Sequence, residues 1–205
     1  FKKTFNSLSK SENLEKIEKK ENDTKVKKPI VAGGGQFSLF DDPQEPIQSN
    51  ITIKRANINS ESHFYQFVET DFAFEIFLEH LSRQKSVCFD TETTSLNPLR
   101  AKIVGIAFSW ESHKGFYIPF PENDLKSKHI IEKLRPFFEN SSVEKIGQNL
   151  KYDIKVLNQY KIAVKGPLFD TMIAHYIINP DMRHNMFVLA ENYLNYEVIP
   201  IENLI

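Results

Sequence analysis

Two acidic residues stand one residue apart at the end of a short apolar run, in the tripeptide Asp90-Thr91-Glu92. The run before them, from Ser86 to Asp90, is typical of a β-strand, and side chains two apart on a strand point to the same face of a sheet. Two carboxylates held side by side repel one another unless a cation lies between them. Mg²⁺ and Mn²⁺ prefer oxygen ligands of this kind, so the pair predicts a divalent metal site. The alternative is a solvated strand end that carries two unrelated acids.

A second segment, residues 147–153, indicates a passage from a strand into a helix. Gly147 permits a tight exit from the strand, and Asn149 is expected to cap the helix. Asn149 and Asp153 are four residues apart and so share a helix face. From that face Asp153 can point across the sheet edge towards Asp90 and Glu92. Three carboxylates at one edge are the outline of a two-metal phosphoryl-transfer site. The alternative is an ordinary capped helix, with a first-turn Asp favoured by the helix dipole.

The elements that must position these acids follow from the periodicity of apolar residues. Apolar side chains recur at helical spacing in several stretches, and β-rich runs mark strands between them. The expected strands cover residues 86–90, 102–110, 115–120 and 143–146. The expected helices cover residues 74–81, 130–138 and 186–194, and two more helices begin after Asn149 and after Asp170. Asp170 can cap the helix that follows it. Early strands in a row, followed by strands alternating with helices, predict an α/β fold: a mixed sheet of about five strands with helices on both faces.

The chain of 205 residues is 40% hydrophobic, carries a formal net charge of -1 and contains one cysteine. No apolar run approaches the roughly 20 residues that span a bilayer, so we expect no membrane partner. The single Cys88 excludes a disulfide framework and is compatible with a reducing cytosol. Because no histidine stands close to it, we expect Cys88 to be a small buried strand residue, neither a nucleophile nor a ligand.

Residues 1 to about 50 differ in composition from the rest of the chain. Lys and Glu dominate the stretch from Lys10 to Lys28, three glycines follow, and no apolar period is sustained. Such a segment cannot bury enough apolar surface to offset its chain entropy. We therefore expect residues 1–50 to form a flexible linker and residues 51–205 to form a folded domain. One apolar island interrupts the linker, Gln36-Phe37-Ser38-Leu39-Phe40.

Three blocks of sequence carry a resemblance to a known family. They are Asp90-Thr91-Glu92-Thr93, Gly147-Gln148-Asn149-Leu150-Lys151-Tyr152-Asp153 and Phe169-Asp170-Thr171-Met172. In this order and spacing they resemble the 3′→5′ exonuclease domain of bacterial DNA polymerase I, a family A DNA polymerase. The similarity covers about residues 86–205 and is looser over 51–85. The resemblance implies a ribonuclease-H-like (DnaQ-like) exonuclease fold, proofreading hydrolysis of the 3′-terminal phosphodiester of DNA, and two metal ions, Mg²⁺ or Mn²⁺.

The resemblance also implies roles for single residues. Asp90 and Glu92 match the family's first motif, which ligates the catalytic metals, and Asp153 matches the acidic residue of the second motif, which supports the second metal. Further residues match positions along the path of the 3′-terminal nucleotides: Thr91, Gln148, Asn149 and Tyr152. Leu96 matches an apolar residue that wedges against the terminal base, whereas Ile201 stands near a position where the family often carries an aromatic.

Two more stretches bear on the comparison with the family. Arg183 and the His beside it resemble the family's next stretch, and Arg183 can contact a phosphate; a solvated loop is the alternative. The family's third motif, a Tyr with an Asp four residues later, has no match, since Tyr193 is followed at that spacing by Glu197, in a different stretch of the expected fold. The resemblance therefore implies a domain truncated before its third motif, with weak or no nuclease activity as it stands. The segment from Phe1 to Phe5 resembles the end of a preceding 5′-nuclease region.

The resemblance implies a bacterial cytoplasmic protein associated with the nucleoid. Its expected partners are a single-stranded 3′ end of DNA and the polymerase and 5′-nuclease domains of the same chain. Two other functions stay open: a stand-alone exonuclease of the same superfamily that trims RNA, and a non-catalytic domain that braces a polymerase. Loss of the carboxylates would mark a bracing domain, and Asp90, Glu92 and Asp153 are all present.

The island in the linker resembles the short peptide by which bacterial replication proteins bind the sliding clamp. There a Gln hydrogen-bonds at the edge of a pocket and a Leu-Phe pair fills an apolar groove, roles that would fall to Gln36, Leu39 and Phe40. The alternative is that the island packs on the exonuclease or 5′-nuclease domain of its own chain. The sequence favours neither.

Overall fold

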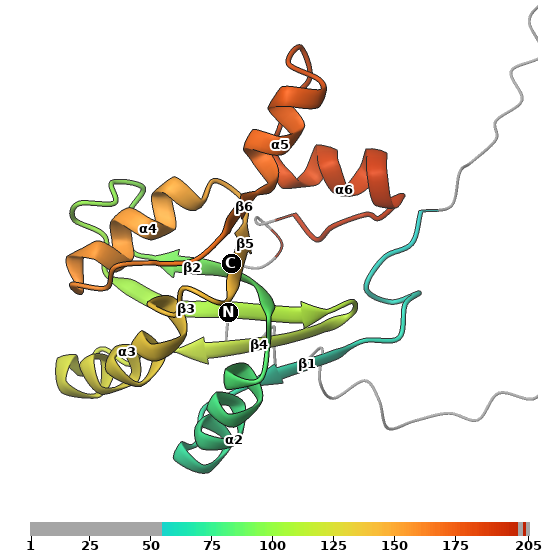
Figure 1. Ribbon diagram of the computed structural model, residues 1–205. Coiled ribbons are helices and arrows are strands. Elements are labelled where there is room, and N and C mark those ends of the chain that lie inside the picture. Colours follow the sequence, from blue (N-terminus) through green and yellow to red (C-terminus); the bar gives the residue numbers. More distant parts are fainter. Residues whose placement is uncertain (1–54, 201–202, 204–205) are drawn as a thin grey trace, which may run out of the picture. The chain divides into compact units, whose positions relative to one another are not determined.

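A computed structural model of the chain describes residues 55–200 and residue 203. The expected linker with its island from Gln36 to Phe40, and Ile201 near the other end, lie outside the described residues. Figure 1 shows a sheet with helices packed along it and further helices after the last strand. None of the described helices is long and apolar enough to cross a membrane.

Six strands of the described region form one mixed sheet. They are β1 (Phe64–Phe67), β2 (Ser86–Thr93), β3 (Ile103–Glu111), β4 (Lys114–Pro119), β5 (Glu144–Gly147) and β6 (Leu168–Asp170). Their order across the sheet is β1-β4-β3-β2-β5-β6. Strand β3 is antiparallel to β2 and β4, and the other neighbouring pairs are parallel. The expected mixed sheet is confirmed. Periodicity missed its two edge strands because four residues in β1 and three in β6 are too few to show an alternation.

Five helices lie in the described region. They are α2 (Asp71–Ser82), α3 (Asp124–Phe138), α4 (Leu150–Gln159), α5 (Thr171–Ile178) and α6 (Met186–Leu194). Four of them begin after a polar residue whose side chain accepts hydrogen bonds from first-turn N–H groups: Thr70, Asn123, Asp170 and Asn185. Such caps satisfy N–H groups that have no partner inside the helix. The helices expected from the apolar stripes are confirmed, including the cap by Asp170.

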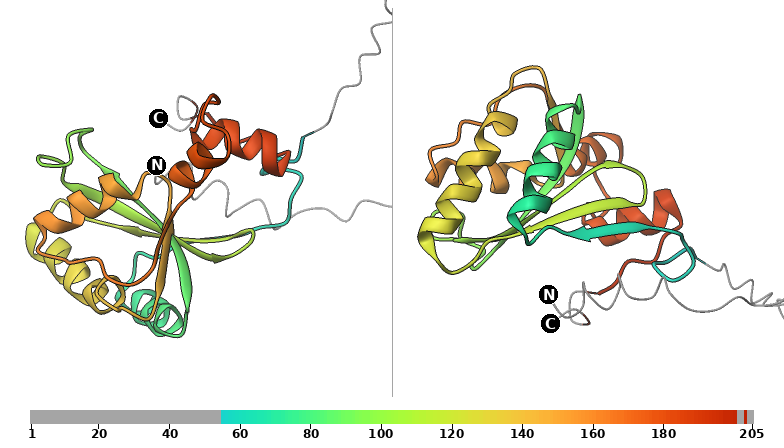
Figure 2. Two further views of the ribbon diagram at one scale, coloured as in Figure 1. Left: turned by 45° about the horizontal axis from the view of Figure 1, so that its top comes forward. Right: turned by 90° about the horizontal axis from the view of Figure 1, so that it is seen from below.

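The core lies on one face of the sheet, where Phe89 of β2 and its cross-strand partner Phe108 of β3 point. The ring of Phe138 in α3 packs edge-on against Phe89 at 5.2 Å, and the ring of Phe77 in α2 lies 5.2 Å from Phe108. Leu150 of α4 belongs to the same core. Figure 2 shows α2 and α3 on one side of the sheet when it is seen from below. Helices α2, α3 and α4 all contribute to this core, because the large apolar side chains of β2 and β3 point to this face.

Candidate active site at the end of strand β2

The opposite face of β2 carries the two acids of the first motif. Asp90 and Glu92 are both half-buried and alternate with the core residues Phe89 and Thr91. Their cross-strand partners in β3 are the small residues Ala107 and Gly105. These small partners leave room on the face of the acids, and over Gly105 that room is taken by the hydroxyl of Tyr117 from β4. The predicted placement of the two acids on one face is confirmed.

Cys88 shares this face and is exposed, which corrects the expectation of a buried strand residue. Its place in β2, two residues before Asp90, decides this, because alternation sends it away from the core of Phe89. Although the residue as a whole is exposed, neighbouring atoms partly remove its sulfur from water, and this partial burial, together with the charges of Asp90 and Asp153, raises the pKa of the Cys88 thiol. The thiol is therefore adjacent to the acids and little ionised at neutral pH.

The third acid, Asp153, contacts β2 at the point where the pairing of β2 with β5 ends. In the described sheet, β5 pairs with β2 only along Ser86–Cys88, so the backbone of β2 beyond Phe89 has no strand partner on that side. The carboxylate of Asp153 occupies this position: its Oδ1 accepts a hydrogen bond from the backbone N–H of Thr91 at 2.9 Å and another from the Thr91 hydroxyl at 2.6 Å. The side chain of Asp153 comes from the first turn of α4 and is almost fully buried. The structure thus brings Asp153 to the residue between Asp90 and Glu92.

The three carboxyl groups share a partly buried, negatively charged environment. Burial, with the nearby charges of Asp153 and Glu92, raises the pKa of Asp90 to about 7. Burial and the charge of Asp153 also raise the pKa of Glu92. Burial raises the pKa of Asp153, although its hydrogen bonds from Thr91 act in the opposite direction. A raised pKa means that the charged form of an acid is destabilised, and a divalent cation beside the carboxylates would stabilise it.

The chemistry of the donor set fits the expected ions, because carboxylate oxygens are the ligands that Mg²⁺ and Mn²⁺ prefer. Between Arg55 and Pro200, however, no group of three or more His, Cys, Asp or Glu side chains is arranged to hold a metal ion. Metal binding by Asp90, Glu92 and Asp153 therefore stays a prediction.

Helix α4, which carries Asp153, is held at its start by a residue from the neighbouring strand. Asn149 adopts a left-handed conformation, with φ of 61°, and its side chain makes no capping hydrogen bond, which corrects the expected cap. The carboxylate of Asp170 accepts hydrogen bonds from the backbone N–H groups of Asn149 and Leu150 instead, at 3.1 and 2.8 Å. Asp170 is the register partner of Gly147 at the end of β5, which places it beside the start of α4. Because Asp170 also caps α5, one carboxylate fixes the beginnings of two helices.

The polar side chains expected along the path of the 3′ strand make hydrogen bonds within the protein. Gln148 donates to the backbone carbonyl of His184 at 2.5 Å and accepts a hydrogen bond from Thr171. The hydroxyl of Tyr152 shares a hydrogen bond with Thr93 and donates one to the backbone carbonyl of Ser95, each at 2.5 Å. These two side chains therefore fix two segments beside the acids, the loop after β2 and the turn between α5 and α6.

Each of these fixed segments carries one of the expected substrate contacts at its surface. Leu96 in the loop after β2 is 96% exposed, as a residue that meets a terminal base must be. Arg183 in the turn before α6 is exposed and immediately precedes His184, whose carbonyl Gln148 binds. Their contacts with nucleic acid stay predictions.

Tyr117 of β4 is a residue near the acids that sequence reasoning missed. A Cβ atom at Gly105 would lie 2.1 Å from the Tyr117 hydroxyl oxygen, so the tyrosine hydroxyl lies directly over this glycine. Gly105 is the cross-strand partner of Glu92. Burial, and to a lesser degree the charge of Glu92, raises the pKa of Tyr117 to about 12. The signal in the sequence was a glycine inside a strand, which often marks a close approach of another group.

Comparison with solved structures supports the expected ribonuclease-H-like fold. Brucella melitensis NrnC with bound Mg²⁺ is similar over 68% of this chain and 65% of that chain, with a TM-score of 0.55 and 19% sequence identity. At that level of identity the likeness shows the fold alone.

The family is shown by the sequence. Residues 65–202 match the 3′-5′ exonuclease family. The chain is 35% identical over 173 residues to DNA polymerase I of Borreliella burgdorferi, a match that covers 83% of this chain and 19% of that protein. It is 32% identical over 149 residues to DNA polymerase I of Pseudomonas aeruginosa, covering 68% and 16%. The chain belongs to the 3′-5′ exonuclease domain family of DNA polymerase I, and it spans less than a fifth of the length of these two relatives.

Proposed function

We propose that this chain removes nucleotides from the 3′ end of DNA, as the proofreading exonuclease of a bacterial DNA polymerase I. The observation that carries the proposal is the contact of Asp153 with the backbone of Thr91, between Asp90 and Glu92. This contact brings Asp153, from a distant part of the sequence, to the residue that stands between the two acids of β2. Membership in the 3′-5′ exonuclease family supports the polarity of the reaction.

Asp90, Glu92 and Asp153 would hold the Mg²⁺ or Mn²⁺ ions through their carboxylate oxygens. When bound, a pair of such ions lowers the pKa of the attacking water and stabilises charge on the leaving 3′ oxygen. The protein holds the acids on one rigid strand end and one capped helix start, so little reorganisation is needed when substrate arrives. The raised pKa of Asp90 supports the assignment, because perturbed acids gather at functional sites.

The segments fixed by Tyr152 and Gln148 would guide the 3′ strand to the acids. Tyr152 holds the loop that presents Leu96, which would pack against the terminal base. Gln148 holds the turn that presents Arg183, whose guanidinium would bind a phosphate. In this proposal Tyr152 and Gln148 position those contacts, and Leu96 and Arg183 make them.

The third motif is the part of the family pattern that the chain does not match. None of its seven tyrosines is followed four residues later by an Asp. We infer that a longer chain carrying such a pair degrades DNA at full rate and that the 205-residue chain degrades it slowly or not at all.

The test compares both chains on single-stranded DNA labelled at its 5′ end, with Mg²⁺ or Mn²⁺. The longer chain should shorten the DNA stepwise from the 3′ end, and Asp90→Ala in that chain should abolish shortening. In a chain that also includes a polymerase domain, Asp90→Ala should leave DNA synthesis intact. Glu122→Ala, which removes an exposed carboxylate before α3, is the matched control and should have no effect. Shortening at near wild-type rate by Asp90→Ala would place the site elsewhere, and equal rates for the two chains would refute the role of the third motif.

A labelled RNA of the same sequence tests the alternative of an RNA-trimming exonuclease. The two relatives are both named DNA polymerase I, which favours DNA. Preferred shortening of RNA would reverse that choice. If neither nucleic acid is shortened by the longer chain, the remaining candidate is a domain that braces the polymerase.

We further propose that the whole protein is cytoplasmic, associated with the nucleoid and joined to 5′-nuclease and polymerase domains. The island of Gln36, Leu39 and Phe40 is proposed to bind the sliding clamp. A labelled peptide covering residues 32–43 should bind the clamp of the source organism with micromolar affinity, since two buried apolar side chains contribute about 1.5–3 kcal/mol each before ordering costs. The double variant Leu39→Ala, Phe40→Ala should not bind, and equal binding by both peptides would contradict the proposal.

A further inference from the structure

Two histidines contact each other beside the turn that joins α5 to α6. The Nδ1 atom of His175, in α5, lies 2.7 Å from the Nδ1 atom of His184, in that turn. A hydrogen bond between two such nitrogens contains one proton, so one ring donates and the other accepts. The pair thus connects a side chain of α5 to the residue that follows Arg183.

Aromatic rings from both helices enclose the pair. The ring of His175 packs edge-on against that of Tyr193 in α6, with the centroids 5.4 Å apart. The ring of Tyr176 packs in the same way against that of His184, at 5.3 Å. The Tyr193 hydroxyl also accepts a hydrogen bond from Asn179 at the end of α5, at 2.8 Å. His175 is 5% exposed in this setting, whereas His184 is half-buried.

The Nε2 atom of His175 is buried and has no hydrogen-bond partner within the described part of the chain. An unpaired polar atom in the interior is unfavourable, and an apolar side chain of similar size would avoid that penalty. Packing alone therefore does not explain a histidine at this position. The contact of its Nδ1 atom with His184 is what an apolar residue could not supply.

His184 is held at two points. Its backbone carbonyl accepts the hydrogen bond from Gln148, beside the start of α4, and its ring is bound by His175. The first contact alone would leave the residue free to rotate about the bonded carbonyl, and the second removes that freedom. Arg183 is the preceding residue and is exposed, so the two contacts together set the direction in which its side chain leaves the turn.

We propose that His175 is a positioning residue for DNA binding, which acts through His184 to direct Arg183 towards a phosphate of the 3′ strand. This inference rests on the proposed function, because it needs the contact between Arg183 and DNA. A turn that is already ordered loses less conformational freedom when the guanidinium binds, so affinity rises. His175 contributes to binding in this way without touching DNA.

The test compares substitutions of His175 that imitate different ring nitrogens. The amide group of Asn is bonded directly to Cγ, as Nδ1 is, so His175→Asn keeps a partner for His184. The amide group of Gln lies nearer to the position of Nε2, so His175→Gln does not, and His175→Leu removes both. The Kd of the 205-residue chain is measured with Mg²⁺ and a single-stranded DNA whose last linkage is a phosphorothioate, which slows hydrolysis. It should rise several-fold in His175→Gln and His175→Leu and stay near the wild-type value in His175→Asn.

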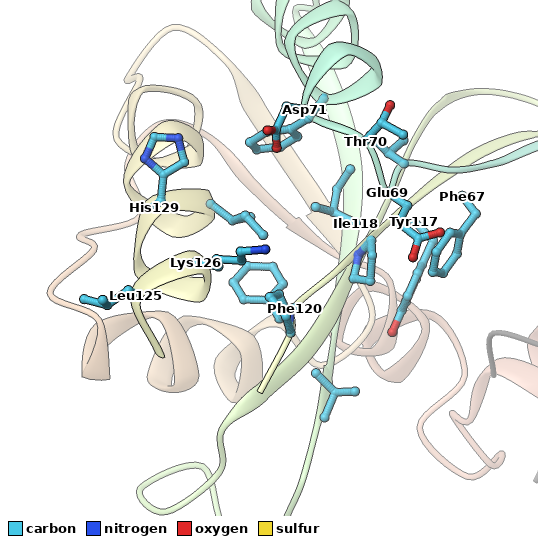
Figure 3. Close-up of a pocket in the computed structure, with 16 residues that line it drawn as sticks. Phe67, Glu69, Thr70, Asp71, Tyr117, Ile118, Phe120, Leu125, Lys126 and His129 are labelled. Atoms are coloured by element: carbon cyan, nitrogen blue, oxygen red, sulfur yellow. The ribbon is translucent and has the colours of Figure 1, made fainter. Parts of the chain in front are cut away.

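Three further measurements separate positioning from a purely structural role. His175→Leu should not lower Tm, because it removes a buried unpaired nitrogen, although it weakens binding. Arg183→Ala should itself weaken binding, and adding His175→Leu to it should have no further effect. His129→Leu is the matched control, because His129 is an exposed histidine of α3 that lines a separate groove between α2 and α3 (Figure 3). It should leave the affinity unchanged.

Deuterium exchange reports on the turn without DNA. The N–H of Met182 donates to the backbone carbonyl of Asn179 at 3.2 Å within the turn. It should exchange faster in His175→Leu and His175→Gln than in the wild-type chain, and as slowly as wild type in His175→Asn. Because this readout needs no substrate, it distinguishes failure of the positioning role from failure of the proposed function.

Four outcomes would overturn the proposal. The first is wild-type affinity, or wild-type exchange of the Met182 amide, in His175→Leu. The second is a loss of affinity in His175→Leu that comes with a lower Tm and is not rescued in His175→Asn, which would mark a structural role. The third is a loss of affinity that persists in the Arg183→Ala background, so that His175 acts elsewhere. The fourth is an unchanged affinity in Arg183→Ala itself, which would also remove the phosphate contact from the proposed function.

Discussion

Replacement of Asp170 tests how the end of one strand positions the site. Its carboxylate binds N–H groups at the start of α4 and also those of Met172 and Ile173 at the start of α5. Loss of one helix cap costs about 1 kcal/mol. Asp170→Ala should therefore lower the free energy of unfolding by about 2 kcal/mol. In a domain of this size, that corresponds to a fall in Tm of about 4–8 °C.

Two variants calibrate this prediction. Asn185→Ala removes a cap that serves only α6, through the N–H of Val188, so it should cost about 1 kcal/mol. Asp170→Asn keeps one accepting oxygen and loses the other, so its cost should fall between the two alanine variants. Urea unfolding should give the same m-value for all of them, since each changes stability without changing the surface exposed on unfolding.

Asp170→Ala should also change the contact between Asp153 and strand β2. A looser start of α4 weakens the hydrogen bond from the Thr91 N–H to Asp153, so the Thr91 amide should exchange with deuterium faster in Asp170→Ala. The Asn185→Ala control should not alter that exchange. If Asp170→Ala costs no more than Asn185→Ala and leaves the Thr91 amide as slow as before, the double role of Asp170 is refuted.

Three shorter predictions concern the acid face. Without metal ions, the free energy of unfolding should fall as pH rises from 3.8 to about 7, because Asp90 holds its proton more tightly in the folded than in the unfolded chain. In a series of urea-unfolding measurements at different pH, Asp90→Asn should flatten this fall. An unchanged slope would contradict the raised pKa of Asp90. Asp90→Asn should also lower the pKa of the Cys88 thiol, seen as a shift of its alkylation rate profile to lower pH. A profile that stays in place would show that the charge of Asp90 does not act on the thiol. Gly105→Ala should cost about 1–3 kcal/mol because the new Cβ meets the Tyr117 hydroxyl. Gly115→Ala, where the nearest contact is 3.1 Å, should cost less in the same thermal melts, and equal losses would refute the crowding argument.

The parts of the fold that sequence predicted are those with long, regular patterns. The apolar stripe from Phe74 to Leu81 predicted α2, and the alternation before Asp90 placed both acids of β2 on one face. Such patterns mark the buried face of an element, and they are recognisable only when the element is long enough for the pattern to repeat. The edge strands β1 and β6 lacked that length, so their pairing depends on neighbours far along the chain.

The details of the site that sequence missed are contacts between elements. Asn149 has the residue type of a cap, but Asp170 on the adjacent strand takes that role. Cys88 has the residue type of a buried position, but its register on β2 exposes it. Tyr117 comes near Glu92 only because the strands between them pair in one register. Residue preference is local, whereas these outcomes depend on tertiary geometry.

The alternation of β2 also guards the folding of the sheet. A slip of one residue in this strand would turn every side chain to the opposite face. Asp90 and Glu92 would then enter the core in place of Phe89 and Thr91. Two buried, unpaired carboxylates are so unfavourable that such a state cannot compete with the native one. The two acids therefore help to select the native register of β2 by raising the free energy of the misaligned pairing. A variant in which both are replaced by alanine should populate misaligned states more, even if the native contacts of the remaining residues are unchanged.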